Sequence, residues 1–385
     1  MTRSPTSQAD ALLVALFRRA RSGAGPVPGW PPGLPTEVFA AAVGHHRGWP
    51  VLAALGDLVA GLPGELATEA VQRQRRAVQR RLVQDADLAD SAVRLDTAGI
   101  PWACVKGPVL AARYQRVGLH RSASDLDLLV PPARLADALR ALTTAGGGLL
   151  SRNFTLMRAE LPGEVAVQAG RGTVVDLHWS LVNRSRRRRW TSVSTGELLD
   201  RARTDDVGGR PLRVLHPADA LVHLCLHAGL AGGSRLGWLL DVALTVEQTP
   251  VDWAEVVRVA RQWRVGRVVG LVLARSRRLL GAPVPRGVIG SLAGPSWRAA
   301  ETVVGRRVPA ARSDSDGWAA RLVVGSAEHA SVVVLGGTRL RRRLGARPPV
   351  RVAGSPLQDP GSTLYPSGDV GDLAAYLDAV AQEVG

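Results

Sequence analysis

Two aspartates separated by one residue form the first candidate site in the sequence. Asp125 and Asp127 stand in SDLDLLV, where acidic and aliphatic residues alternate. Such alternation is typical of a β-strand, and residues i and i+2 of a strand face the same side. Both carboxylates would then share one face, while Leu126 and Leu128 enter the core. Adjacent carboxylates repel each other, and a divalent cation such as Mg²⁺ relieves that repulsion. The alternative is a chance pair on a surface strand.

A third carboxylate, Asp176, lies in TVVDLHW, a second strand-like run. If the two strands are neighbours, Asp176 joins the pair, and three carboxylates can hold two metal ions for in-line phosphoryl or nucleotidyl transfer. Otherwise Asp176 would hydrogen-bond nearby backbone. His178, two residues further on, is a candidate for contact with a bound nucleotide.

Lys106 is the only lysine among 49 basic residues. The excess of arginine, with abundant Ala, Val, Gly and Pro, indicates codon use in a GC-rich genome. Either one lysine codon survived by chance, or the site requires a compact ammonium instead of a planar guanidinium. We expect Lys106 and Gly107 to form a strand-to-helix turn, where backbone N–H groups and the helix dipole favour a phosphate. Arg121 and Ser122 are further phosphate-binding candidates.

The elements around these residues follow from hydrophobic periodicity and turn signals. The pattern predicts helices over 8–20 and from Pro63 to Ala98, then a change of texture after Gly99. A mixture of strands and helices there predicts an α+β core. Its expected strands are IPWACV, DLDLLV, FTLMRAEL, EVAVQAG and TVVDLHWSL, and its expected helices are GPVLAARYQR and PPARLADALRALTTAGG.

The chain of 385 residues is long for a single core. We expect four consecutive regions. They are an N-terminal helical region 1–90, a core 91–198, a C-terminal helical domain 199–345, and a linker with a short helix 346–385.

The net charge, the cysteines and the apolar runs indicate the partners and the compartment of the protein. The net charge of +16 favours polyanionic partners such as nucleotides, although codon bias alone explains the arginines. Cys104 and Cys225 stand in apolar runs and are expected to be buried free thiols. No signal peptide and no run of about 18 apolar residues is found, so we expect a cytoplasmic protein. The basic runs 185–190 and 339–346 are expected to be solvated loops, or contacts to a nucleic acid.

Several stretches resemble a known family. KGPVLAARY, HRSASDLDLLV, VVDLHWSL, ALVHLCLHAG and RLGWLLDVALTV are similar to the uncharacterised nucleotidyltransferase family of the DNA polymerase β-like superfamily, over about residues 95–250. The resemblance implies a small mixed sheet flanked by helices. It also implies Mg²⁺-dependent transfer of a nucleoside monophosphate from an NTP.

The resemblance also assigns roles to positions in this sequence. It implies Asp125 and Asp127 as the metal pair, Asp176 as the third acid, and Lys106 with Gly107 at the nucleotide loop. One departure concerns the residues before the acids, where better-known members carry Gly-Ser and this chain has Ser-Ala-Ser. The departure affects the expected geometry of the loop and leaves the acids in place.

Three functions are compatible with these patterns. The first is an enzyme that transfers a nucleotide to a hydroxyl or phosphate of a small molecule or peptide natural product. The second is a toxin-like enzyme with a tRNA or protein acceptor, and the third is a non-catalytic nucleotide-binding module. His223 and His227 have a zinc-ligand spacing, but H-E-x-x-H is absent, so we interpret them as packing residues. Asp241 is expected to pair with one of them or with Arg235.

Overall fold

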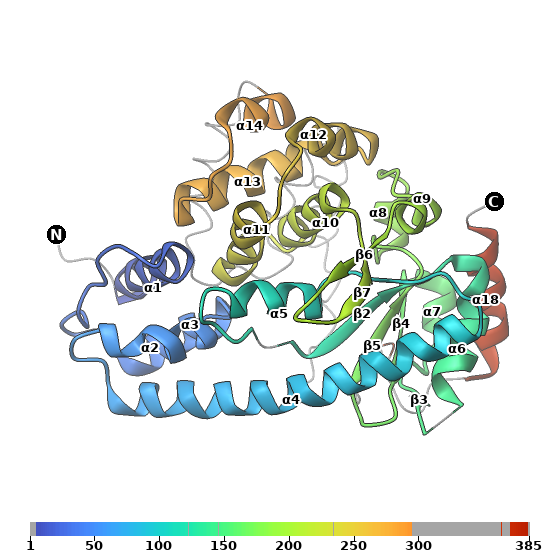
Figure 1. Ribbon diagram of the computed structural model, residues 1–385, viewed down its shortest axis with the longest axis horizontal. Helices are drawn as coiled ribbons and strands as arrows, with labels where there is room; N and C mark the ends of the chain where they lie inside the picture. Colours follow the sequence, from blue (N-terminus) through green and yellow to red (C-terminus); the bar gives the residue numbers. More distant parts are fainter. Residues whose placement is uncertain are drawn as a thin grey trace, which may run out of the picture. The chain divides into compact units, whose positions relative to one another are not determined.

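The computed structural model describes residues 5–121, 123–144, 146–233, 235–294, 363 and 370–383. The described elements follow in chain order, and Figure 1 labels them where there is room. They are α1 (Pro5–Ser22), α2 (Thr36–His45), α3 (Trp49–Leu55), η1 (Gly56–Leu58), α4 (Gly64–Thr97), β1 (Ala103–Cys104), α5 (Gly107–Gln115), β2 (Asp125–Leu129), η2 (Pro132–Arg134), α6 (Leu135–Thr143), β3 (Gly148–Leu149), α7 (Phe154–Glu160), β4 (Glu164–Gln168), β5 (Val174–His178), α8 (Ser185–Arg188), α9 (Thr195–Asp200), β6 (Arg203–Asp206), β7 (Pro211–Val214), α10 (Pro217–Leu230), α11 (Leu236–Gln248), α12 (Trp253–Gln262), α13 (Gly266–Leu280), α14 (Arg286–Ala293), η4 (Val370–Asp372) and α18 (Leu373–Gln382).

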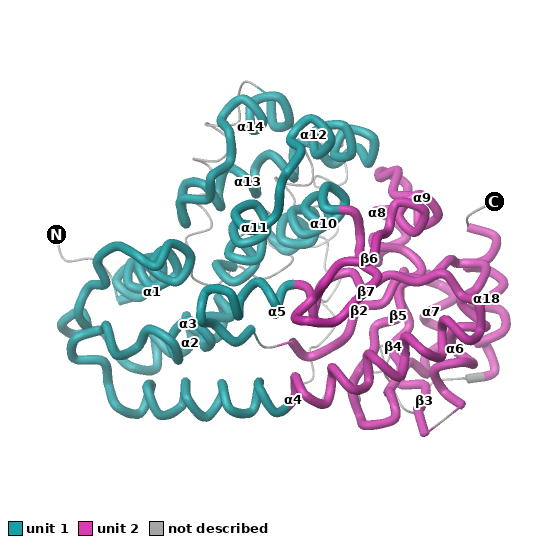
Figure 2. Tube along the Cα trace, in the orientation of Figure 1, with its two compact units in different colours: residues 1–79, 110–122, 217–332 teal, residues 80–109, 123–216, 333–385 magenta. Residues whose placement is uncertain are grey.

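The chain divides into two compact units, which Figure 2 shows in two colours. Each unit gathers three separate stretches of chain, whereas the sequence analysis expected four consecutive regions, whose boundaries stay predictions. Unit 1 comprises 1–79, 110–122 and 217–332, and unit 2 comprises 80–109, 123–216 and 333–385.

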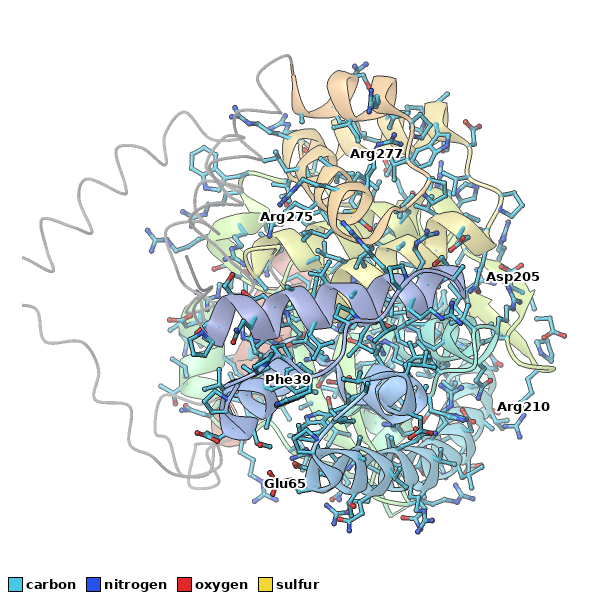
Figure 3. The ribbon with its side chains drawn as sticks, turned by 90° about the vertical axis from the view of Figure 1, so that its left-hand side faces the viewer. Phe39, Glu65, Asp205, Arg210, Arg275 and Arg277 are labelled. Atoms are coloured by element: carbon cyan, nitrogen blue, oxygen red, sulfur yellow. The ribbon has the colours of Figure 1, made fainter. Side chains whose placement is uncertain are left out.

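Unit 1 is helical in its described residues, as the periodicity predicts. In α12 the side chains of Val256, Val259 and Ala260 are buried at helical spacing, and the Asp252 carboxylate accepts bonds from two backbone N–H groups at the helix start. Arginine also serves as an internal donor here: Arg275 is buried and its Nε donates to the Gly233 carbonyl at 2.7 Å. Figure 3 labels this arginine among the side chains.

Unit 2 contains a seven-stranded mixed sheet in the order β3-β4-β5-β2-β1-β7-β6. The pairs β2–β5 and β1–β7 are parallel, and the other pairs are antiparallel. The predicted α+β class with a mixed sheet and flanking helices is therefore confirmed. The short β1 leads directly into α5, which confirms the predicted strand-to-helix turn at Lys106 and Gly107.

The core of unit 2 lies on the face of the sheet opposite to the acids. Leu126, Leu128, Val175 and Leu177 alternate with polar residues along β2 and β5, and all four are fully buried. They belong to one hydrophobic cluster with residues of α4, α6, α7 and α18. This packing fixes the register of the central strands, because a slip by one residue would turn the carboxylates into the hydrophobic cluster.

Three local predictions differ from the structure. FTLMRAEL was expected to be a strand, but it forms α7, whose start is capped by the Asn153 side chain. The hairpin β6–β7 was not predicted, and Gly208 and Gly209 at its turn have φ angles of 68° and 84°. Two consecutive positive φ angles are what a two-residue hairpin turn requires.

The third difference concerns SRRRRW, which was expected to be a solvated loop. It contains α8, and Arg188 donates to the carbonyls of Leu161 and Val182 and pairs with Glu383. Its guanidinium carbon lies 4.4 Å from the centroid of the Trp179 ring. The basic run 339–346 and the segment 346–362 lie outside the described residues.

Candidate functional site

The three predicted acids lie on one face of the sheet. Asp125 and Asp127 occupy alternate positions of β2, and β5 runs parallel beside it. The register of the two strands pairs Asp127 with Asp176. Register partners in a sheet point to the same side, so the core packing of Leu126 and Leu128 also directs all three carboxylates away from the core.

Lys106 contacts this acidic face. Its Nζ lies 2.8 Å from Asp127 Oδ1, and the lysine side chain is 18% exposed against 2% for the aspartate. Burial alone would raise the pKa of Asp127, but the Lys106 charge and a hydrogen bond from His178 outweigh it and hold this pKa well below its usual range. Asp127 therefore carries a full negative charge, and the ammonium of Lys106 compensates it.

His178 connects the acids to a residue that the sequence analysis missed. Its Nε2 lies 3.1 Å from Asp127 Oδ1, and its Nδ1 lies 3.3 Å from Glu164 Oε2. An ionised carboxylate only accepts hydrogen bonds, so Nε2 carries the proton. Burial alone would lower the pKa of His178, but the bond to Asp127 and the Glu164 charge raise it. Glu164 starts β4 opposite His178, and the alternation in EVAVQ was the available signal.

Asp176 is the carboxyl group of this face whose pKa is raised. Burial, followed by the charge of Glu164, raises its pKa from 3.8 to about 7, and Asp125 and Asp127 add to this effect. The positive charge of His178 offsets part of it. Burial and the neighbouring carboxylates both disfavour the ionised form of Asp176, and a bound cation would favour it.

The chemistry of the donor set on this face suits a divalent cation, although the side chains are not gathered around one point. Asp127 Oδ2 is buried and has no hydrogen-bond partner within the described chain, so one oxygen of this carboxylate is uncommitted. Asp125 Oδ2 accepts a bond from the Ser124 hydroxyl at 3.1 Å. Carboxylate oxygens are the ligands that Mg²⁺ prefers. As the side chains stand, however, no three His, Cys, Asp or Glu residues among those described form a group that could hold a metal ion.

Arg121 belongs to unit 1 and makes a contact that was not predicted. Its Nε and Nη2 lie 3.0 and 3.1 Å from the two carboxylate oxygens of Asp241, a bidentate pair. Asp241 was expected to pair with a histidine or with Arg235, and the partner that the structure shows is Arg121. Tyr114 packs against the same pair, and its hydroxyl donates to the Gly237 carbonyl. Ser122 lies outside the described residues.

The remaining candidates have structural surroundings. The rings of His223 and His227 lie 6.3 Å apart, and His227 packs edge-on against Trp238. Cys104 and Cys225 are free and buried, as predicted, and burial raises the pKa of both thiols. None of the described helices is both long enough and apolar enough to cross a bilayer.

Comparison with known proteins decides the family. Residues 41–281 match the sequence model of a family described as uncharacterised nucleotidyltransferases. The chain belongs to this family. The match extends on both sides of the region 95–250 on which the resemblance was noticed, and it confirms both the resemblance and the enzyme class. This nucleotidyltransferase carries its three candidate acids on one face of the sheet of unit 2.

Comparisons with individual proteins give no further evidence on the function of this nucleotidyltransferase. No curated protein matches the chain significantly. Among solved structures, the chain is similar to a solution structure of the antibiotic-resistance factor ANT(2'')-Ia, with 16% identity over 59% of this chain and 97% of that one. The TM-score is 0.30, and a likeness of that size carries no argument about function.

Proposed function

We propose that this nucleotidyltransferase moves a nucleoside monophosphate from an NTP to a hydroxyl or phosphate group of a small molecule or peptide natural product. The observation that supports the proposal most strongly is the register of β2 and β5, which places Asp127 beside Asp176, with the Lys106 ammonium on Asp127. Acids on neighbouring strands and a cation beside a helix start together suit a metal-bound polyphosphate.

In the proposed reaction each residue of the acidic face has one task. Asp125, Asp127 and Asp176 would hold Mg²⁺, which supplies charge neutralisation at the reacting phosphate when it is bound. With Mg²⁺ bound, Asp176 would be ionised, and its carboxylate could also accept the proton of the acceptor hydroxyl. The Glu164–His178 pair orients the Asp127 carboxylate, a support that ligands of metals generally have.

Lys106 and Gly107 would bind the triphosphate at the start of α5. An ammonium has three N–H donors, so contact with Asp127 does not exclude contact with a phosphate oxygen. A Cβ atom added to Gly107 would meet the nearest protein atom, the Asp125 carbonyl oxygen, at 3.7 Å, which is ordinary contact. The fold therefore does not require glycine at this position, whereas close approach of a phosphate would. Arg121 is not needed for this arrangement, since its guanidinium is paired with Asp241.

A transfer assay tests the proposed function. The purified protein is incubated with each α-labelled NTP, Mg²⁺ and a cell extract, and labelled products are separated. Label should appear in a small-molecule or peptide fraction with the parent protein and disappear with Asp125→Ala and Asp127→Ala. Equal labelling by the parent and the variants would show that the reaction does not need these acids. Label in tRNA or in a large protein would instead show that the acceptor is a tRNA or a protein.

A further inference from the structure

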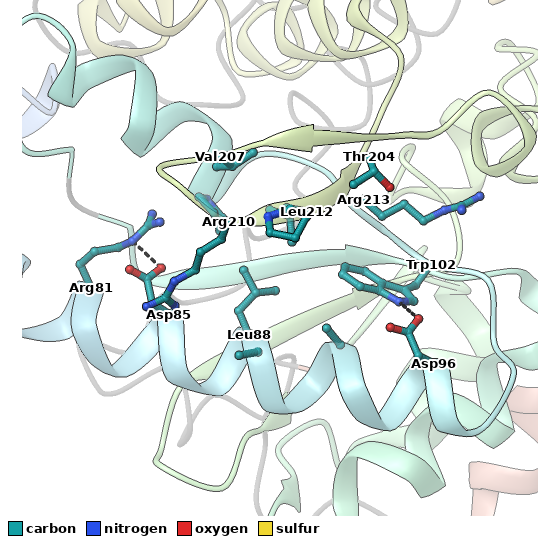
Figure 4. Close-up of a pocket in the computed structure, with 14 residues that line it drawn as sticks. Arg81, Asp85, Leu88, Asp96, Trp102, Thr204, Val207, Arg210, Leu212 and Arg213 are labelled. Carbon is teal, nitrogen blue, oxygen red and sulfur yellow. Dashed lines mark hydrogen bonds and ion pairs between the residues drawn. The ribbon is translucent and has the colours of Figure 1, made fainter.

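A cavity lies in unit 2 on the face of the sheet opposite to the acids. It has a volume of about 340 Å³ and lies between α4 and the β6–β7 hairpin, as Figure 4 shows. Its apolar wall includes Leu88, Trp102 and Leu212, which belong to the hydrophobic cluster of unit 2. Trp102 and Leu128 fall on the same side of the sheet, because Cys104 pairs with Leu128 in register. A molecule in this cavity is therefore separated from the acids by the sheet.

The charges around the cavity are unequally compensated. Asp85 forms an ion pair with Arg81 at 2.7 Å, and Asp96 accepts the indole N–H of Trp102 at 2.8 Å, so both carboxylates already have a partner. Arg210 is exposed, and its guanidinium makes no ion pair with any described residue. In Figure 4 its side chain extends from the hairpin turn toward α4. The cavity thus combines an apolar wall with an uncompensated guanidinium at its mouth.

We propose that this cavity is a binding site for a small aromatic carboxylate, separate from the acidic face. A pocket of a few hundred Å³ with apolar walls and a few polar groups is typical of small-molecule sites. The wall around Leu88 and Leu212 suits an aromatic body, and the planar fork of Arg210 suits a carboxylate, which it can hold with two parallel hydrogen bonds. Such a ligand would lie on the opposite side of the sheet from the acids and would not contact them.

Calorimetric titration with 1-naphthoate tests this site, with the uncharged isostere 1-naphthamide as comparator. Titrations are made in EDTA without nucleotide, so the result does not depend on the proposed transfer reaction. We expect 1-naphthoate to bind with one site per chain and 1-naphthamide to bind about tenfold more weakly, because the charged hydrogen bonds are lost.

Three variants locate the binding. Arg210→Gln should weaken 1-naphthoate about tenfold, and should leave the amide unchanged. Ala89→Trp fills the cavity from an exposed position of α4 that lines it, and it should abolish binding of both probes. Arg80→Gln removes the same charge from an exposed position of α4 outside the lining and should have no effect. Equal affinity for the two probes, equal effects of the two arginine variants, or no binding at all would overturn the proposal.

Discussion

Replacing Asp176 by asparagine should stabilise the folded protein, and the gain should depend on pH. The pKa of Asp176 is about 7 in the folded state against 3.8 for an ordinary aspartate. Well below the unfolded pKa of 3.8 the group is protonated in both states and has no effect. Between the two pKa values the unfolded state loses the proton that the folded state keeps, so stability falls by about 1.4 kcal/mol for each pH unit. Above pH 7 the full loss is about 4 kcal/mol.

Urea unfolding at several pH values measures this effect. In EDTA, we expect Asp176→Asn to exceed the parent in free energy of unfolding by about 1 kcal/mol at pH 4.5, about 2 at pH 5.5 and about 4 at pH 8. Asp200→Asn, an exposed carboxylate at the end of α9, is the matched control and should show no such trend. A gain that is constant with pH, or no gain at pH 8, would refute the electrostatic reasoning.

The same variants test the metal assignment without an activity measurement. Excess MgCl₂ at pH 8 should raise the free energy of unfolding of the parent, because binding to the folded state stabilises it. The increase should be smaller in Asp176→Asn, since one ligand has lost its charge. An equal Mg²⁺ effect in both proteins would mean that Asp176 does not hold the ion.

Four further variants give independent results. Gly107→Ala should keep or raise the melting temperature yet weaken NTP binding, measured by calorimetry. Unchanged binding would show that this loop does not contact the phosphates. Lys106→Met should lower the free energy of unfolding by about 3 kcal/mol at pH 8, because the buried Asp127 loses its ammonium partner and keeps His178; a loss of under about 1 kcal/mol would contradict the pairing. Glu164→Gln should weaken Mn²⁺ binding about tenfold in a spectroscopic titration, and an unchanged affinity would remove its supporting role. Asp241→Asn should cost about 3 kcal/mol in urea unfolding, since it leaves a largely buried arginine without its bidentate partner; a neutral result would contradict that pair.

Much of the acidic face could be predicted from local patterns. The alternation in SDLDLLV fixes which side chains of β2 share a face, because the strand period is two and Leu126 and Leu128 are buried. Placing Asp176 beside Asp127 needed strand adjacency, which the sequence suggested only through the resemblance. Lys106 was singled out by composition, but its contact with Asp127 joins residues from different elements and has no local signal.

Other features depend on pairings between distant segments. Glu164 was overlooked because its role depends on β4 lying antiparallel to β5, opposite His178. The pairing of Arg121 with Asp241 joins residues 120 positions apart, and no periodicity reveals it. The run FTLMRAEL is too short for its period to separate helix from strand, and its Asn153 cap was the overlooked helix signal. The Gly208-Gly209 turn was an available hairpin signal.

The fate of the phosphates tests the central claim most directly. The protein, Mg²⁺ and an acceptor-containing extract fraction are incubated in parallel with NTP labelled at the α-phosphate and at the γ-phosphate. A site in which Asp125, Asp127 and Asp176 direct nucleotidyl transfer should attach the α label to the acceptor and release the γ label as pyrophosphate, with both lost in Asp127→Asn. Attachment of the γ label to the acceptor, or α transfer that persists in the variant, would contradict the account.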